Sequence, residues 1–124
     1  MTGLLPPYED EPPGYAIEYA AEAAPPRIRL AGEMDLRAAS DLREALLTAL
    51  SDGGGSVLLD MARLSFIDST IISVLVMARK RADLNHGVVY LASVPERIGR
   101  ILALTGIDSL FALADEAEGA DPTA

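Results

Sequence analysis

The sequence predicts an α/β fold, a mixed sheet of four or five strands packed with about four helices. Three observations favour it. The chain has 124 residues, which suits one domain. Half of the residues are hydrophobic and 23% are charged, so there is enough apolar surface for a packed core. Strand-like runs also alternate with segments whose apolar residues recur every three or four positions, and strands joined by a crossover helix pair in parallel.

The two ends of the chain differ in composition from the part between them. Residues 1–14 combine several prolines with acidic residues, which predicts a flexible, Pro-rich acidic tail. Residues 117–124 are predicted to form a second flexible tail. We therefore place the domain at residues 15–116.

The first half of the domain predicts two strands and a helix. Residues 15–21 alternate weakly, as in an edge strand, and residues 27–31 alternate as in a half-buried strand. Residues 36–51 carry leucine and alanine at helical spacing, which predicts an amphipathic helix. Asp35 is the expected N-cap, and the three glycines of residues 53–55 end the helix.

The centre of the sequence predicts a buried strand followed by a second helix. Residues 57–61 are a short apolar run, typical of a parallel strand covered on both faces. Residues 64–67 lead on to three residues that favour helix starts, Asp68, Ser69 and Thr70. The helix expected from about residue 70 to residue 84 is apolar early and basic late, an order that complements the helix dipole.

The last part predicts a strand, a helix and a final edge strand. Residues 88–92 are a buried strand. The segment Ser93-Val94-Pro95-Glu96 fits a capping box, and the helix that it opens ends at Gly106. Residues 110–113 suit an edge strand, and residues 115–118 suit the start of a short terminal helix.

Composition argues against several classes of function. The formal net charge is -9 at pH 7, so nucleic acids and anionic membranes are poor partners. There are no cysteines, which removes disulfides, thiolate catalysis and cysteine-ligated metals. We find no signal-peptide pattern and no apolar run near the roughly 18 residues that a bilayer requires, and we expect a cytoplasmic protein.

The sequence contains little evidence of an enzyme active site or a cofactor site. The one histidine, His86, suits an exposed turn better than a catalytic base. Ser69 follows a strand and opens a helix, as in a nucleophile elbow, but isoleucines occupy the two glycine positions of that motif. The glycines of residues 53–55 lack the lysine of a phosphate loop, and the carboxylates show no metal-loop spacing. We expect no enzyme activity, no cofactor and no metal.

The strongest candidate site is the tripeptide Asp68-Ser69-Thr70. One interpretation is simple helix capping. The other is a hydroxyl that is modified, because the free N–H groups of a helix N-terminus can hold a phosphate. Phosphorylation there adds about -1.5 to -2 charges, at a point that a partner would have to desolvate. The residues alone leave both interpretations open.

Three ordered segments between about residues 27 and 113 resemble the STAS domain of anti-sigma factor antagonists. Residues 30–35, Leu-Ala-Gly-Glu-Met-Asp, are similar to the family's L-x-G-E-L-D segment. Residues 59–70 resemble its L-D-L-x-x-L-x-F-[IM]-D-S-[ST]-G segment up to the final glycine. Residues 93–107 are similar to its late helix and the following turn. The resemblance implies a single STAS (SpoIIAA-like) domain, a mixed sheet backed by helices.

The resemblance implies a partner switch gated by phosphorylation. The unmodified protein would bind an anti-sigma factor that is itself a serine kinase, and so free a sigma factor. The kinase would then phosphorylate Ser69, which releases the antagonist, and a phosphatase would reset it. The resemblance implies that two segments contact the partner. Their residues are Gly32, Glu33, Asp35, Leu36, Asp68, Ser69, Thr70, Ile71 and Ile72. We expect a monomer or a weak dimer.

Ile71 departs from the family pattern, which usually has glycine there. A β-branched residue restricts the backbone and is expected to add bulk beside the acceptor. This departure motivates a second hypothesis, a STAS scaffold or assembly subunit without a phospho-switch, in a signalling platform or a lipid-transport complex. A third hypothesis, a hydrolase, lacks a base.

Overall fold

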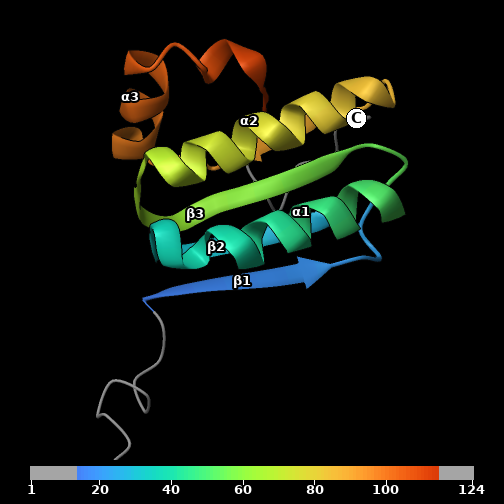
Figure 1. Cartoon of the computed structure of the whole chain (residues 1–124), viewed down its shortest axis with the longest axis horizontal. Coiled ribbons are helices and arrows are strands. Elements are labelled where there is room, and N and C mark those ends of the chain that lie inside the picture. The colour runs from blue at the N-terminus through green and yellow to red at the C-terminus, as the bar shows by residue number, and fades with distance from the viewer. Residues whose placement is uncertain (1–13, 115–124) are drawn as a thin grey trace, which may run out of the picture.

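The computed structural model describes residues 14–114 and has the α/β architecture that the sequence predicts (Figure 1). The tails expected at residues 1–14 and 117–124, and the helix start expected at residues 115–118, lie outside the described residues except for Gly14. The described part contains five strands in one mixed sheet and three α-helices, where about four helices were expected. Two short 3-10 helices accompany them.

The strands lie in the sheet in the same order as in the chain, β1-β2-β3-β4-β5. β1 pairs antiparallel with β2, and the other neighbours pair in parallel because an α-helix crosses over between them. The elements are β1 (Tyr15–Ala20), β2 (Arg27–Met34), η3 (Leu36–Ala38), α1 (Ala39–Asp52), β3 (Val57–Ile67), α2 (Ser69–Leu84), β4 (Val89–Ala92), α3 (Glu96–Leu104), η4 (Asp108–Leu110) and β5 (Ala112–Ala114).

The two central strands are longer than expected. β2 continues to Met34 and β3 to Ile67, and these two residues are paired across the sheet. Two register shifts interrupt the pairing, between Arg29 and Ala31 and between Gly32 and Glu33. Such irregularities break the simple alternation of polar and apolar side chains, which is why the sequence pattern ended both strands too early. The paired ends bring the starts of η3 and α2 together.

Two expected helix starts differ in the structure. The helix expected at residues 36–51 is divided into η3 and α1, although Asp35 does cap η3. The capping box expected at Ser93 is wrong, because α3 has Pro95 at its N-cap and no side-chain cap. Ser93 has a left-handed φ of 54°, so the chain turns there, and the extended Pro95 then sets the helix start.

The core lies between one face of the sheet and the helices. Ile28, Leu59 and Leu91 point from three strands into the same cluster as Leu46 and Leu75 of the helices, and none of them is exposed. Each such side chain contributes roughly 1.5–3 kcal/mol by leaving water. No polar or charged residue of the described part is buried. The polar side chains of residues 14–114 are therefore all at least partly exposed, although the Nε atom of Arg27 is buried.

Two tyrosines of β1 fasten this edge strand to α1. The Tyr15 hydroxyl donates to Asp41 Oδ2 at 2.8 Å, and the Tyr19 hydroxyl donates to Asp52 Oδ2 at 2.7 Å. The two bonds lie at opposite ends of both elements, so they fix the direction of β1 relative to α1.

The pKa of Tyr19 is raised from its ordinary value of 10.0 to about 12, first by partial removal from water and second by the bond to Asp52, although the side chain stays 37% exposed. Because the folded pKa is the higher one, the stabilisation is complete below pH 10.0 and is lost as the pH rises towards 12. When tyrosine ionisation is followed by ultraviolet absorbance, we expect one tyrosine to titrate near pH 12 and this step to be missing in Tyr19→Phe. If the step survives in that variant, it belongs to another tyrosine.

Gly32 lies where two backbone segments approach each other closely. Its φ is +84°, and a Cβ at this position would lie 2.1 Å from the carbonyl oxygen of Gly14. The same carbonyl accepts a hydrogen bond from the Glu33 N–H at 2.8 Å. Only glycine fits both the left-handed backbone and this contact.

Gly32→Ala is expected to destabilise the domain by more than about 2 kcal/mol, because it adds a backbone clash to an unfavourable φ. The matched control is Gly54→Ala, where φ is +66° and no atom lies within 4 Å of the added Cβ. The control is expected to cost only about 1 kcal/mol. Urea denaturation measures both, and equal losses would show that the contact with Gly14 is unimportant.

Candidate functional site

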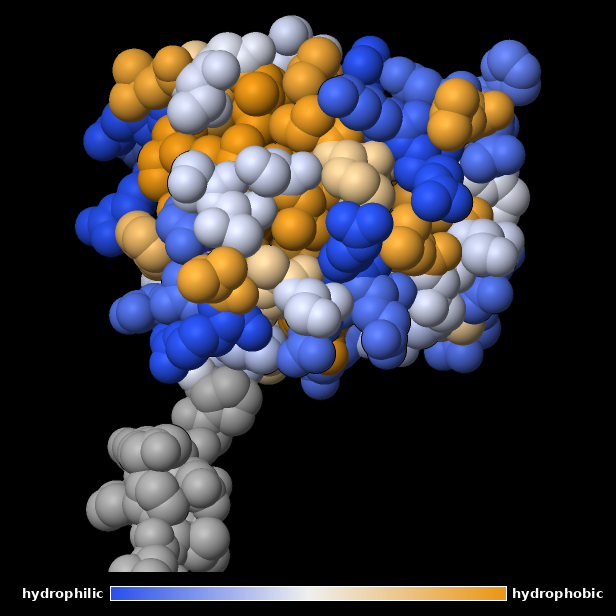
Figure 2. Space-filling view, viewed as in Figure 1, coloured by the Kyte–Doolittle hydropathy of each residue, from blue (hydrophilic) through white to orange (hydrophobic). Residues whose placement is uncertain are grey.

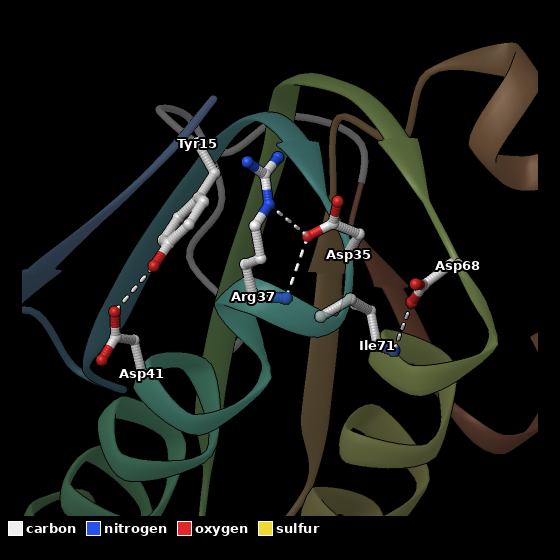
Figure 3. Close-up of polar contacts among 6 residues, drawn as sticks. All are labelled: Tyr15, Asp35, Arg37, Asp41, Asp68 and Ile71. Carbon is white, nitrogen blue, oxygen red and sulfur yellow. Dashed lines mark hydrogen bonds and ion pairs between the residues drawn. The ribbon is translucent and has the colours of Figure 1, made fainter. Parts of the chain in front are cut away.

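The sequence-predicted site residues come together at the carboxyl ends of β2 and β3. Glu33 is paired with Phe66 and Met34 with Ile67, so the loops that follow the two strands are neighbours. Figure 3 shows Asp35 on one loop and Asp68 on the other, each hydrogen-bonded to the start of its own helix. Carboxyl ends of parallel strands are a common place for binding sites in α/β proteins.

Asp68 sets the geometry of the α2 start. Its backbone is extended, and its Oδ1 accepts a hydrogen bond from the Ile71 N–H at 3.1 Å. Its carbonyl accepts the first intrahelical bond, from the Ile72 N–H, at 3.1 Å. The first four N–H groups of a helix have no partner in earlier turns, so the amides left over at this end are those of Ser69 and Thr70.

Ser69 is the first residue of α2, and its side chain is exposed. Its carbonyl accepts a hydrogen bond from the Ser73 hydroxyl at 3.0 Å, which supports the first turn. The helix dipole and the free amides favour negative charge at this position. Ser69 is therefore an exposed residue at a helix end whose electrostatics favour negative charge.

Ile71 does not occupy the place that the sequence analysis gave it. It was expected among the partner-binding residues and beside the acceptor, but its side chain is 0% exposed and belongs to the hydrophobic core. The reason is helical periodicity, since Ile71 lies on the same face as the buried Leu75 and Ala78. A bulky residue at this position therefore leaves the Ser69 hydroxyl uncovered.

Asp35 forms the second cap at this edge. Its Oδ1 accepts from the Arg37 N–H at 2.9 Å and from the Arg37 Nε at 3.2 Å (Figure 3). The side-chain hydrogen bond from Arg37, followed by the backbone one, lowers the pKa of Asp35 below its ordinary value of 3.8. Asp35 thus stays ionised near neutral pH, with one guanidinium partner beside it.

The remaining expected residues frame Ser69 with different degrees of exposure. Leu36 is 69% exposed and Glu33 is exposed, whereas Gly32, Thr70 and Ile72 are half-buried. The structure adds Phe66, which is 42% exposed in register with Glu33. The sequence did not predict this exposure, because side chains of a regular strand point alternately to its two faces. In the structure both Ser65 and Phe66 are exposed.

His86, the one histidine of the chain, lies far from Ser69. His86 follows the end of α2, whereas Ser69 opens it, and a helix of 16 residues separates them by about 24 Å. Within residues 14–114 no three acidic or histidine side chains are grouped as metal ligands. None of the helices described there has the length and apolarity that a membrane crossing requires.

Comparisons with known proteins agree with this geometry. Residues 17–113 match the family described as "Mlab, STAS domain". An anti-sigma-B factor antagonist of Staphylococcus epidermidis is 31% identical over 84 residues, which cover 68% of this chain and 78% of the relative.

Solved structures share the fold. The anti-sigma factor antagonist SpoIIAA in its unphosphorylated form superimposes with a TM-score of 0.73 at 23% identity, over 87% of this chain and 96% of that chain. SpoIIAA of Bacillus in its phosphorylated form gives 0.68 at 22% identity, over 88% and 100%.

Asp68→Ala is expected to lower the free energy of unfolding by about 1 kcal/mol, because the Ile71 N–H loses its cap. Asp68→Asn keeps an acceptor oxygen and is expected to retain most of the stability. Chemical denaturation of both variants checks this. Similar losses in the two would mean that the charge, and not the hydrogen bond, stabilises the start of α2.

Proposed function

Because this chain belongs to the STAS domain family of anti-sigma factor antagonists, we propose that it controls a sigma factor by partner switching. The unphosphorylated protein binds an anti-sigma factor that is a serine kinase, and the bound sigma factor is released. The kinase phosphorylates Ser69 and thereby ends the complex. A phosphatase restores the binding form.

The observation that carries this proposal is the exposed hydroxyl of Ser69 at a preformed helix start. Asp68 orients the first turn of α2, and exposed apolar surface is available nearby on Leu36. An apolar contact next to a polar, modifiable atom suits a surface that binds a partner and can be switched. The core residues of α2, such as Ile71 and Leu75, are already packed before any partner binds.

The size of the electrostatic effect supports a switch without unfolding. A phosphoryl group on Ser69 would stand beside Asp68, while Glu33 lies near the end of the neighbouring strand β2 and Asp35 just after it. Burying such charge against a partner that offers no cation costs several kcal/mol. A loss of about 4 kcal/mol lowers affinity roughly a thousandfold. The free domain avoids this cost because Ser69 remains in water.

The relatives support the same role. The Staphylococcus protein is named as an antagonist of an anti-sigma factor, and SpoIIAA has been solved with and without its phosphoryl group. A scaffold or assembly subunit without a phospho-switch remains the second candidate, since Ile71 stands where the family motif has glycine. The burial of Ile71 argues against the scaffold hypothesis, because a buried isoleucine does not cover the hydroxyl of Ser69.

Ser69→Asp is expected to weaken binding of the purified cognate kinase by at least about a hundredfold, because it places a fixed charge in the contact. Ser69→Ala is expected to bind as the parent does and to resist release by ATP. Ser51→Asp, an exposed position at the opposite end of α1, is the matched control and should bind normally. Titration calorimetry measures all four proteins.

Intact-mass analysis after incubation with kinase and ATP locates the modification. We expect the parent to gain one phosphoryl group on Ser69 and Ser69→Ala to gain none. Phosphate on a different residue would refute the assignment of the acceptor. Constitutive binding that neither Ser69 variant changes would instead favour the scaffold.

A further inference from the structure

A basic groove with an apolar floor runs between α1 and α2. Its volume is about 550 Å³, and it is lined by Arg43 of α1 and by Ile72, Val76, Met77, Lys80 and Arg81 of α2. Ser73 and Leu84 complete the lining. Ile72, Val76 and Met77 are half-buried, whereas Leu84 and the three cations are exposed. Figure 1 shows the two helices side by side, and Figure 2 shows hydrophobic and hydrophilic side chains interleaved on this face.

The cations of the groove form no ion pair with the described residues. The ion pairs within residues 14–114 involve other basic residues, and Arg43, Lys80 and Arg81 take part in none of them. Seven of the nineteen acidic residues of the chain, and none of its ten basic residues, lie outside the described part. The groove therefore carries three cations that form no ion pair with the described residues, although the whole chain has a net charge of -9.

The groove is also continuous with the surface around Ser69. Ile72 lies one turn after Ser69, and the groove follows α2 from there to the last turn, where Leu84 is 78% exposed. From residue 72 to residue 84 the helix extends about 18 Å, which matches about three turns of a second helix. A partner held at Ser69 can therefore reach the groove without a gap.

From these features we infer that the groove receives an acidic amphipathic helix of the protein that binds at Ser69. Apolar residues spaced three and four apart contact Ile72, Val76 and Met77, and flanking carboxylates pair with Arg43, Lys80 and Arg81. The identity of the partner rests on the proposed function. The chemistry of the groove does not, because its side chains recognise such a helix whichever protein carries it.

The direct probe is a labelled synthetic peptide with leucine at helical spacing and glutamate elsewhere, followed by fluorescence anisotropy with the full chain. Arg43→Glu/Lys80→Glu is expected to lower its affinity at least about tenfold. Arg97→Glu/Arg100→Glu on α3 changes the net charge equally and should stay within about twofold. The same peptide with lysine for glutamate should not bind the parent. No binding of the acidic peptide, or equal loss in both double variants, overturns the inference.

Other occupants give different results, each of which would overturn the inference. Neutralising Glu9, Asp10 and Glu11 in the full chain would raise peptide affinity about tenfold if the chain's own acidic segment filled the groove. A second copy would appear in sedimentation as a dimer that Arg43→Glu/Lys80→Glu dissociates. Binding to phosphatidylserine vesicles that this variant abolishes would assign the groove to lipid.

The two proposals fail separately when the cognate kinase is tested beside the peptide. If Ser69→Asp abolishes kinase binding and Arg43→Glu/Lys80→Glu matches its control, the groove inference fails alone. If the peptide binds as expected and Ser69→Asp leaves kinase binding unchanged, the proposed switch fails and the groove chemistry stands.

Discussion

The parallel pairing of β2 with β3 is the constraint on which the candidate site depends. Met34 lies opposite Ile67, and the next residue on each strand begins a cap, one at Asp35 and one at Asp68. Two segments more than thirty residues apart in the chain thus form one edge. A slip of one residue in this register would turn the buried side chains of either strand outward and separate the two caps.

The chemistry of the protein follows from what its interior lacks. The described core consists of apolar residues, Phe111 among them, and no residue classed as polar or charged is buried there. Recognition is left to exposed groups at helix starts and to the groove between α1 and α2. Such a molecule is suited to changing partners, because a surface charge can be added or removed while the core stays the same.

Sequence patterns predicted the fold well where side-chain periodicity is regular. Leucine spacing located α1, and residue type alone identified Asp35 as a cap. For α2 the sequence offered three cap-forming residues and a start at about Thr70, and the structure selects Asp68 as the cap. The patterns failed where backbone geometry decides. Register shifts hid the last residues of β2 and β3, and the left-handed backbone of Ser93 displaced a helix start. The burial of Ile71 follows from the helical spacing it shares with Leu75 and Ala78, but the family motif drew attention to Ser69 and away from that face. The exposure of Phe66 depends on the irregular pairing of β2 with β3, which local sequence does not contain.

The inward position of Ile71 has a consequence for any enzyme that modifies its neighbour. Unwinding the first turn of α2 into an extended strand would pull this isoleucine out of the core, which costs roughly 1.5–3 kcal/mol. Under the proposed switch, this cost favours a kinase that accepts Ser69 on a folded helix. An isolated peptide that spans the same residues lacks the packing that holds this turn.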